Sequence, residues 1–387
     1  MWLDAMREGA GEFVRLRRDL HQHPELGLQE FRTSDLVAAQ LEGWGYTVHR
    51  GLAETGVVAQ LQRGTGSKRL GLRADMDALP IHETNTFAHA SCHPGVMHAC
   101  GHDGHTAMLL AAAKHIALRG EFSGTLNLIF QPAEEHPGGA KIMIEQGLFK
   151  RFPCDAVFAM HNMPGVPAGH LVFVDGPAMA SSDDVTITLS GTGGHGAMPH
   201  RASDTIVAAS SIVMALQTII SRNVNPQQTA VITVGAFNAG QANNVIPASA
   251  RLELSVRALD REVRDLLEQR IHALVTTQAE GFRVTAHIDY RRDYPVLVNT
   301  PDETALARQV GAELLGAAGI TAQGQPLTGS EDFAFMLEHC PGSYVQIGNG
   351  AGEGACSVHN PGYDFNDDIL PTGAAFWCLL VQRFLTA

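Results

Sequence analysis

The densest group of chemically capable side chains lies between Met97 and His105, where three His, one Cys and one Asp occur within nine residues. Cys100 and His102 are two residues apart in a glycine-containing turn. A thiolate and an imidazole placed this way can converge on one divalent metal ion, because both are good ligands for borderline metals. A single Cys-x-His pair is weak evidence, but the density of the whole group favours a metal site. The alternative is a helix-capping Asp103 with incidental His neighbours, and His105 fits that description.

A pair of adjacent carboxylates, Glu134 and Glu135, follows an expected apolar strand at residues 125–130. In open α/β sheets, functional groups gather beyond the carboxyl ends of the strands. Two carboxylates in this position suit a division of labour, in which one binds a metal ion and the other accepts a proton from a water molecule that the metal activates. The alternative is a solvated pair in a loop. The position directly after a buried strand favours the functional reading.

Further polar residues occur at other expected strand ends. Asp75 and Asp77 come at the end of the expected strand 69–75, and His161 follows the short apolar strand 156–160. His359 lies far along the chain. Each His alone would more often be a hydrogen-bonded structural residue. Together with the groups above, they predict a metal centre along one edge of a sheet.

The elements expected around these residues alternate between helices and strands. Expected helices run to about residue 20 and over 31–42, 106–118 and 140–148, and the strands are those at 69–75, 125–130 and 156–160. Such alternation predicts an α/β domain with a mixed, largely parallel sheet.

The pattern changes after about residue 182. A strand at 185–189 alternates apolar and polar residues, and further elements follow at 204–221, 229–237, 250–256, 261–278 and 283–288. Their order, strand–helix–strand–strand–helix–strand, is that of a split βαβ (ferredoxin-like) α+β unit. We therefore expect a discontinuous catalytic metal-binding domain over 1–182 and 295–387, with an inserted lid or dimerisation domain over 183–294. Helices at 302–315 and from residue 370 complete the first domain.

Composition narrows the possible classes of protein. A chain of 387 residues exceeds what one core usually organises. The net charge of −13 disfavours nucleic acid as a partner. Six scattered Cys do not suggest a disulfide scaffold, and the N-terminal residues lack the apolar segment of a signal peptide. We expect no apolar segment long enough to span a bilayer. We therefore expect a cytoplasmic protein without a membrane partner.

The motifs resemble a known family in their order along the chain. They resemble the hippurate hydrolase and indole-acetyl-amino-acid hydrolase group of aminoacylase/carboxypeptidase-type, metal-dependent amidohydrolases. The resemblance covers nearly the whole chain, from His21 to Asn366. It is carried by five ordered motifs, which are Arg73–Pro80, His98–Asp103, Gln131–Glu135, His161–Asn162 and Gly194–Ala197.

The resemblance implies two divalent metal ions per subunit. Mn²⁺, Zn²⁺, Co²⁺ and Ni²⁺ are all candidates for these ions, because each suits the implied ligands. Glu134 matches the general base, which later donates the proton to the leaving amine. Asp75 and Asp77 match a ligating His and its orienting Asp in the wider superfamily. Because position 75 is Asp here, both are expected to orient ligands rather than to bind metal. The implied metal ligands are Cys100 (as the bridge), His102, Glu135, His161 and His359.

The inserted segment carries further matches. His195 matches a residue that reaches the neighbouring subunit's site and stabilises the oxyanion, which implies a homodimer or a larger homo-oligomer. Asn244 and Arg257 match positions that bind the oxyanion or the substrate carboxylate. A surface ion pair is the alternative for Arg257. The motif 329–333 matches the family without an assigned role, and His136-Pro137 replaces a loop that is often Gly-rich in relatives.

The resulting hypothesis is an amidohydrolase that cleaves the amide bond of an N-acyl amino acid, with an aryl-acyl or similar group, to a carboxylic acid and a free amino acid. The first alternative is a dipeptidase or carboxypeptidase that acts on small peptides. A non-catalytic metal-binding protein is a weaker alternative, because no ligand or base position carries an inert residue. A serine hydrolase is disfavoured, because the sequence lacks Gly-x-Ser-x-Gly.

Overall fold

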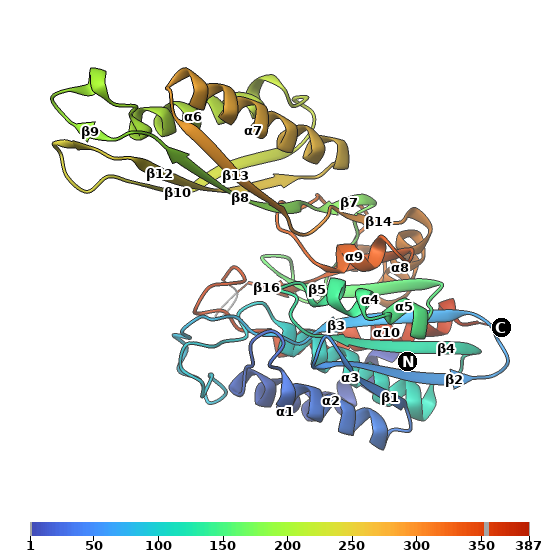
Figure 1. Cartoon of the computed structure of the whole chain (residues 1–387). Coiled ribbons are helices and arrows are strands. Elements are labelled where there is room, and N and C mark those ends of the chain that lie inside the picture. Colours follow the sequence, from blue (N-terminus) through green and yellow to red (C-terminus); the bar gives the residue numbers. More distant parts are fainter. Residues whose placement is uncertain (1, 352–355, 387) are drawn as a thin grey trace. The chain divides into compact units, whose positions relative to one another are not determined.

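The computed structural model describes residues 2–351 and 356–386. The chain forms two compact units (Figure 1). The first unit comprises Met1–Gly176, Val298–Gln325 and Asp332–Ala387, and the second comprises Pro177–Leu297 and Pro326–Glu331.

The first unit is built on a mixed sheet of eight strands with the order β1-β2-β4-β3-β5-β16-β6-β15. Strands β3, β4, β5 and β16 run parallel to one another, whereas β1 and β2 pair antiparallel with each other and β2 with β4. This arrangement confirms the predicted mixed, largely parallel sheet. The strands are β1 (Thr47–Leu52), β2 (Gly56–Arg63), β3 (Arg69–Asp75), β4 (Gly124–Gln131), β5 (Ala156–Pro164), β6 (Leu171–Val172), β15 (Ile320–Thr321) and β16 (Gly342–Gly350).

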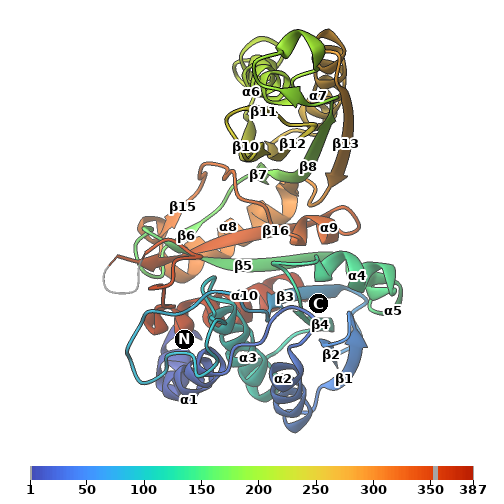
Figure 2. The ribbon, with the colours of Figure 1, turned by 60° about the vertical axis from the view of Figure 1, so that its left-hand side comes forward.

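Helices cover both faces of this sheet (Figure 2). On one face lie α1 (Trp2–Gln22), α2 (Phe31–Gly43), α3 (His102–Arg119) and α10 (Leu370–Phe384), and α8 (Pro301–Leu315) packs on α10. On the other face lie α4 (Gly139–Glu145) and α9 (Phe333–Leu337), with the short α5 (Leu148–Arg151) after α4. Helix α3 packs between β3 and the pair α1 and α10, and 13 of its 18 residues are buried. Its run of alanines permits this close packing, because a small side chain lets neighbouring backbones approach.

The second unit is an antiparallel sheet of order β10-β12-β8-β13, with α6 and α7 on one face. Short strands form two further pairs, β9 with β11 and β7 with β14. The order β8-α6-β10-β12-α7-β13 confirms the predicted split βαβ arrangement. The elements are β7 (Gly176–Met179), β8 (Ser181–Ser190), β9 (Gly194–His195), α6 (Thr205–Arg222), β10 (Ala230–Ala239), β11 (Val245–Ile246), β12 (Ser249–Ala258), α7 (Arg261–Gly281) and β13 (Thr285–Arg292). Strand β14 (Leu297–Asn299) lies where the chain returns to the first unit, which contains its last two residues.

Helix α6 corrects one expectation from the sequence. Among the described residues it is the one helix that is long and apolar enough to cross a membrane by length and composition, although no such stretch was expected. Its apolar residues Ala208, Ile212, Leu216 and Ile219 are buried in the core of the second unit. A core helix of this kind meets the same criterion of length and composition.

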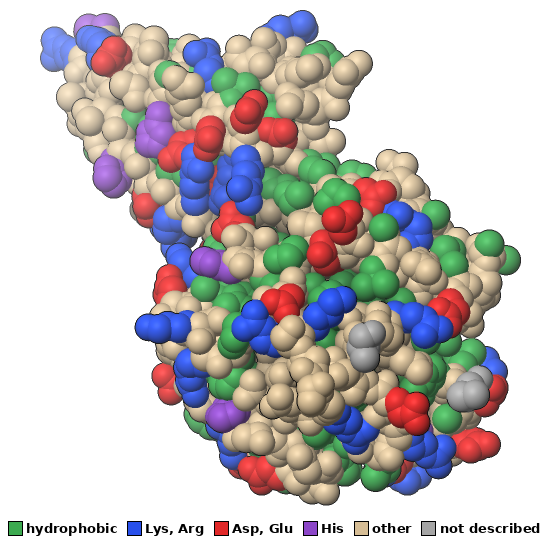
Figure 3. All heavy atoms as spheres, turned by 90° about the vertical axis from the view of Figure 1, so that its right-hand side faces the viewer, with side chains coloured by type: hydrophobic (Ala, Val, Ile, Leu, Met, Phe, Trp, Pro, Cys, Tyr) green, Lys and Arg blue, Asp and Glu red, His purple; other side chains and the backbone are tan. Residues whose placement is uncertain are grey.

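Charged side chains of both signs are interspersed on the surface (Figure 3). In the second unit, Arg292 lies 2.6 Å from Asp265, and Arg251 lies 2.9 Å from Glu253. Exposed pairs of this kind contribute little to stability, roughly 0–1 kcal/mol each. They do reduce the positive field that these arginines would otherwise present to a polyanion.

Candidate metal centre and active site

The polar residues predicted from the sequence meet at the carboxyl ends of β3, β4 and β5. Three overlapping groups of potential ligand atoms each lie within 4.8 Å of one another. They bring Glu134 together with all five predicted metal ligands. The groups are Cys100, His102 and His161; Cys100, Glu135 and His359; and His102, Glu134 and Glu135.

Direct contacts join members of these groups. The Cys100 Sγ atom lies 3.2 Å from His161 Nε2, and Glu135 Oε1 lies 3.1 Å from His359 Nε2. The His359 backbone N–H donates to the carbonyl oxygen of Ala99 over 2.7 Å, which ties this distant segment to the Cys100 turn. Cys100 contacts both halves of the cluster, as expected of a bridging ligand.

Two local predictions need correction. His102 was expected in a turn before the helix, but α3 begins at His102, so this imidazole lies in the first helical turn. His161 was expected after its strand, but β5 continues to Pro164, and His161 pairs with Gln346 of β16. A metal ligand within regular structure is held more firmly than one in a loop, because its backbone is already fixed by hydrogen bonds.

Gly101 makes the sharp entry into α3 possible. Its φ of 90° lies in the left-handed region, which favours glycine. A Cβ atom at this position would lie 2.2 Å from Asn162 Nδ2 and 2.6 Å from the Tyr363 hydroxyl. No other residue fits this space without displacing those side chains. The turn therefore carries Cys100 and His102 on either side of a residue that must be glycine.

Asp77 connects two of the predicted ligands. Its Oδ1 atom lies 3.1 Å from His102 Nδ1, and its Oδ2 atom accepts the Glu135 backbone N–H over 3.0 Å. A hydrogen bond on Nδ1 leaves His102 Nε2 available for coordination, which is the usual arrangement of a ligating imidazole. These contacts agree with the predicted orienting position of Asp77.

The description of His105 as an incidental neighbour is wrong. His105 is buried, its Nδ1 lies 2.7 Å from Asp75 Oδ1, and its Nε2 accepts the Asn162 backbone N–H over 3.0 Å. Asn162 in turn donates to the Cys100 carbonyl oxygen over 2.7 Å. Asp75 and His105 thus support the backbone beside His161 and Cys100. The sequence could not show this, because the partners are 30 and 57 residues apart.

The motif at 329–333 gains a structural explanation through Asp332. This buried carboxylate accepts hydrogen bonds from Arg73 over 3.0 Å, from Gln131 over 2.8 Å and from the Ala140 backbone over 2.9 Å. The Asp332 backbone N–H donates to Glu134 Oε1 over 3.4 Å. Asp332 therefore joins β3, β4 and α4 and helps to orient the predicted base.

The electrostatics of the cluster suit a bound cation. Burial, followed by the charges of Glu135, Glu134 and Asp75, raises the pKa of the Cys100 thiol well above its usual value. Burial alone would lower the pKa of His102, but the opposing effects of Asp75 and Asp77 raise it to about 10. Without a cation, protons on Cys100 and His102 offset the carboxylates. Divalent ions would take the place of those protons.

The residues present also fit two metal ions by their chemistry. The buried atom His102 Nε2 has no hydrogen-bond partner among the described residues. Burial, and then the charge of His105, lowers the pKa of His161 well below its usual value, so that its imidazole is neutral and able to coordinate. A thiolate, imidazoles and a carboxylate suit borderline divalent ions.

A second buried network lies beside the cluster. His21 Nδ1 lies 2.8 Å from Asp103 Oδ2, and its Nε2 lies 3.2 Å from Glu83 Oε1. Arg17, fully buried, reaches Asp364 and Asp367 over 2.7 Å each. The network joins α1, the first turn of α3 and the segment that follows His359.

This network makes the stability of the protein depend on pH. Burial would lower the pKa of His21, but its bonds to Asp103 and Glu83 raise it to about 9. The stabilisation, on the order of 3 kcal/mol, is complete below pH 6.5 and is lost as the pH rises through about 9. In the metal-loaded protein, where His102 is not free to titrate, we expect His21→Gln to reduce the decline in the free energy of unfolding by about this amount, as measured by urea unfolding at pH 6, 7.5 and 9.

His23→Gln is the matched control, because His23 lies two residues away and is partly exposed. It should retain the wild-type decline. An unchanged decline in His21→Gln would show that another group is responsible.

The remaining predicted site residues lie in the second unit. Exposed His195 pairs with Val245 between β9 and β11, and the Gly196 N–H donates to the Asn244 carbonyl oxygen over 2.8 Å. Arg257 on β12 donates to Ser330 Oγ over 2.7 Å. His195 and Asn244 are therefore neighbours in one short hairpin-like pairing. Their meeting with the metal cluster stays a prediction.

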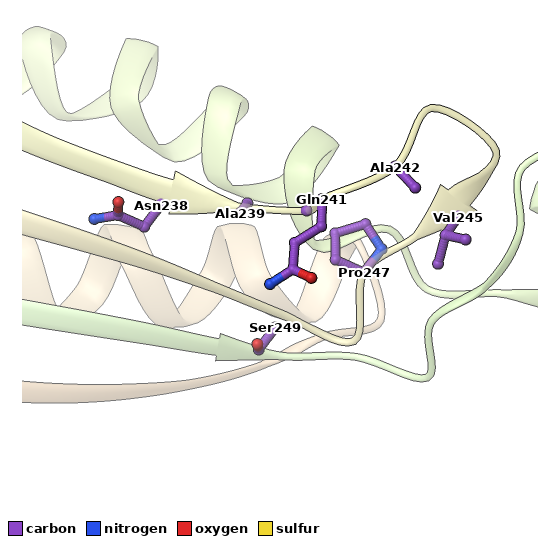
Figure 4. Close-up of a pocket in the computed structure, with 8 residues that line it drawn as sticks. Asn238, Ala239, Gln241, Ala242, Val245, Pro247 and Ser249 are labelled. Carbon is purple, nitrogen blue, oxygen red and sulfur yellow. The ribbon is translucent and has the colours of Figure 1, made fainter.

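A hollow of about 530 Å³ also lies within the second unit, lined by residues of β10, β11 and the segment between them (Figure 4). Figure 4 shows the side chains of Asn238, Gln241, Pro247 and Ser249 around it. No titratable side chain is among its described lining residues. The hollow therefore lacks the groups needed for acid–base or metal chemistry, and the cluster in the first unit remains the candidate active site.

The fold and the cluster together define a metal-dependent hydrolase of the amidohydrolase type. The chain belongs to the peptidase family M20/M25/M40, whose model matches residues 71–383. It is similar to the hippurate hydrolase of Campylobacter jejuni, at 44% identity over 97% of both chains. The N-acetyl-L-cysteine deacetylase of Bacillus subtilis is 37% identical, with 97% of this chain and 88% of that protein covered.

A solved structure agrees with these relatives. The YXEP protein of Bacillus subtilis, a dinuclear metal binding peptidase from the M20 family, superposes with a TM-score of 0.85 at 31% identity, over 98% of this chain and 99% of that one. The predicted family, fold class and amide-hydrolase chemistry are thereby confirmed.

Proposed function

We propose that this protein hydrolyses the amide bond of N-acyl amino acids with an aryl-acyl or similar group, and releases a carboxylic acid and a free amino acid. The observation that carries the proposal is the convergence of Cys100, His102, Glu135, His161 and His359 around Glu134. Relatives named for hydrolysis of hippurate and of N-acetyl-L-cysteine support the substrate class.

The residues of the cluster have different roles in the proposed reaction. Two divalent ions held by the five ligands would supply Lewis-acid activation of a water molecule and of the amide carbonyl. Glu134 accepts the proton of the attacking water and delivers it to the departing amino nitrogen. The Asp332 N–H orients the Glu134 carboxylate, and Asp77 orients His102 and the Glu135 backbone.

Residues of the second unit act on the substrate in this proposal. His195 of a neighbouring subunit, in a homodimer or larger homo-oligomer, donates a hydrogen bond to the developing oxyanion. Such a donor contributes roughly 10²–10³-fold in rate. Asn244 assists at the oxyanion or the substrate carboxylate, and Arg257 binds the carboxylate through its planar fork. The loop at His136 and Pro137 contributes to the choice of acyl group.

The test is hydrolysis of a panel of benzoyl, indole-acetyl, acetyl and aminoacyl amino acids, before and after chelation, with each metal restored in turn. We expect chelator-sensitive release of free amino acid, fastest with an aromatic acyl group. Cleavage confined to dipeptides would support a dipeptidase instead. No cleavage of any member by protein with measured metal content would refute the proposal.

Arg257→Gln is expected to raise KM for N-acyl amino acids by roughly 10–100-fold with little change in kcat, because a hydrogen bond to a charged group contributes about 1.5–3 kcal/mol. Substrates whose carboxylate is replaced by a carboxamide should lose this dependence on Arg257. Arg251→Gln serves as the control, because Arg251 lies on the same strand and pairs with Glu253. Equal effects of the two variants, or no effect of Arg257→Gln, would exclude Arg257 as the carboxylate site.

A further inference from the structure

The segment between α1 and α2, residues 23–30, packs against the loop that holds the two active-site glutamates. A Cβ atom at Gly27 would lie 2.5 Å from the His136 carbonyl oxygen and 3.0 Å from Ala133 Cβ. Leu26 also forms an isolated bridge with Ala78. This close approach places the residues that follow Gly27 directly beside the catalytic loop.

Glu30, the last residue of this segment, binds the loop through its side chain. Glu30 is fully buried, and its Oε1 atom accepts the Ala133 backbone N–H over 2.8 Å. Its Oε2 atom accepts the Thr55 hydroxyl over 2.6 Å. Both oxygens are therefore fixed, one of them on the residue directly before Glu134.

The backbone around Glu134 is held on both sides by buried carboxylates. Glu30 binds the N–H of Ala133, and Asp77 binds the N–H of Glu135 over 3.0 Å. Ala133 has a φ of 53°, a left-handed conformation that is unfavourable for a residue with a Cβ atom. Such a conformation persists only where its surroundings hold it. The hydrogen bond from Ala133 to Glu30 is one such restraint.

A purely stabilising role does not account for Glu30. Burial and, to a smaller extent, the charge of Asp77 raise its pKa to about 7, opposed in part by the hydrogen bonds from Thr55 and Ala133. Neither of the two hydrogen-bond partners described for its side chain is cationic. A buried carboxylate beside another carboxylate lowers stability at neutral pH, as is common for groups retained for function.

We propose that Glu30 is a positioning residue for the general base: by holding the Ala133 N–H, it fixes the loop conformation that directs the Glu134 carboxylate toward the reacting water. This inference rests on the proposed function of Glu134. Glu30 itself touches neither substrate nor metal in this scheme. Its loss should therefore reduce kcat and leave substrate binding and metal content nearly unchanged.

The test compares three variants of Glu30 in the full-length, metal-loaded protein. Glu30→Ala removes the restraint and should lower kcat by roughly 10–100-fold, with KM within about threefold of wild type, because small misplacements of a catalytic group have effects of this size. Glu30→Gln retains an acceptor for Ala133 and a donor toward Thr55, so it should recover most of the lost rate. Glu30→Asp keeps the charge, but its side chain is one methylene too short to reach Ala133, so its kcat should be as low as that of Glu30→Ala. If Glu30→Ala does not fold, Glu30→Asp is the variant that tests the proposal.

Glu25→Ala is the matched control. The Glu25 carboxylate accepts the backbone N–H groups of Arg32 and Thr33 over 2.9 and 2.8 Å, in the same segment but away from Ala133. It should lower the melting temperature without lowering kcat. Metal content and melting temperature are measured for every variant.

Three outcomes would overturn the inference: unchanged kcat in Glu30→Ala, equal losses of kcat in Glu30→Ala and Glu25→Ala, or a loss in Glu30→Ala that follows missing metal. If the wild-type protein cleaves no member of the substrate panel, the proposed function fails instead. The two failures are therefore distinguishable.

Discussion

Glu134→Gln is expected to lower kcat by roughly 10²–10⁴-fold, toward the upper end of what a positioned acid–base group contributes. The upper end is expected because, in the proposed mechanism, Glu134 acts twice, first as the base toward water and then as the acid toward the leaving nitrogen. Glutamine has the same shape and can still accept the Asp332 N–H, so the fold and the substrate site should remain intact. KM should stay within about threefold of wild type.

The measurement combines steady-state kinetics with metal analysis of the same preparation. Glu145→Gln is the control, because Glu145 is an exposed carboxylate at the end of α4, eleven positions further along the chain. It should behave as wild type. If Glu134→Gln keeps more than about a tenth of the wild-type kcat with metal bound, then Glu134 is not the base.

Removal of the metal ions is expected to abolish activity and to destabilise the first unit. Activity should fall at least about 100-fold, since Lewis-acid activation contributes several kcal/mol. Two ions present at about a hundredfold excess over Kd stabilise the folded state by about 5 kcal/mol, which corresponds to a shift in Tm of about 10 °C or more. The loss arises because Glu134, Glu135, Asp75 and Asp77 lie together in a buried site with fewer opposing charges.

Cysteine variants test whether the stabilisation by metal comes from ions bound at the cluster around Cys100. Cys100→Ser should weaken metal binding and lower Tm in the presence of metal, whereas Cys92→Ser should do neither. Cys92 is exposed, and Cys100 is buried in the cluster. The readouts are calorimetric Tm with and without chelator and metal content after dialysis. If chelation leaves Tm unchanged in a protein that binds two ions, the cluster is not the binding site.

Features whose sequence signal lies within a few neighbouring residues were predictable from the sequence. The strand 69–75 was predicted with the bounds that β3 has, and six of its seven residues are buried. The meeting of the candidate ligands with Glu134 could be predicted because most of them occur in short, ordered motifs near strand ends, where parallel strands bring them to one edge. The split βαβ unit was predictable because its strands alternate and its helices are long.

Elements with weak local signals were missed. Strand β16 lies in the centre of the sheet, but all nine of its residues are buried and three are glycines, so it shows neither alternation nor strong strand propensity. Strands β1 and β2 were also not assigned. The supporting residues His105, Asp332 and Glu30 act through partners 25 to 259 positions away, and no local pattern predicts such contacts.

The position of β16 also bears on how the protein forms during synthesis. The first unit is completed by residues after Val298, which supply β16 next to β5, helix α10 against α3, and His359. The second unit is nearly continuous, from Pro177 to Leu297. On a ribosome, which adds about 5–20 residues per second, the second unit can therefore fold while the first still lacks a central strand. We therefore expect the cluster around Glu134 to be assembled last, and the face of α3 that α10 covers to stay exposed in the nascent chain until α10 has emerged.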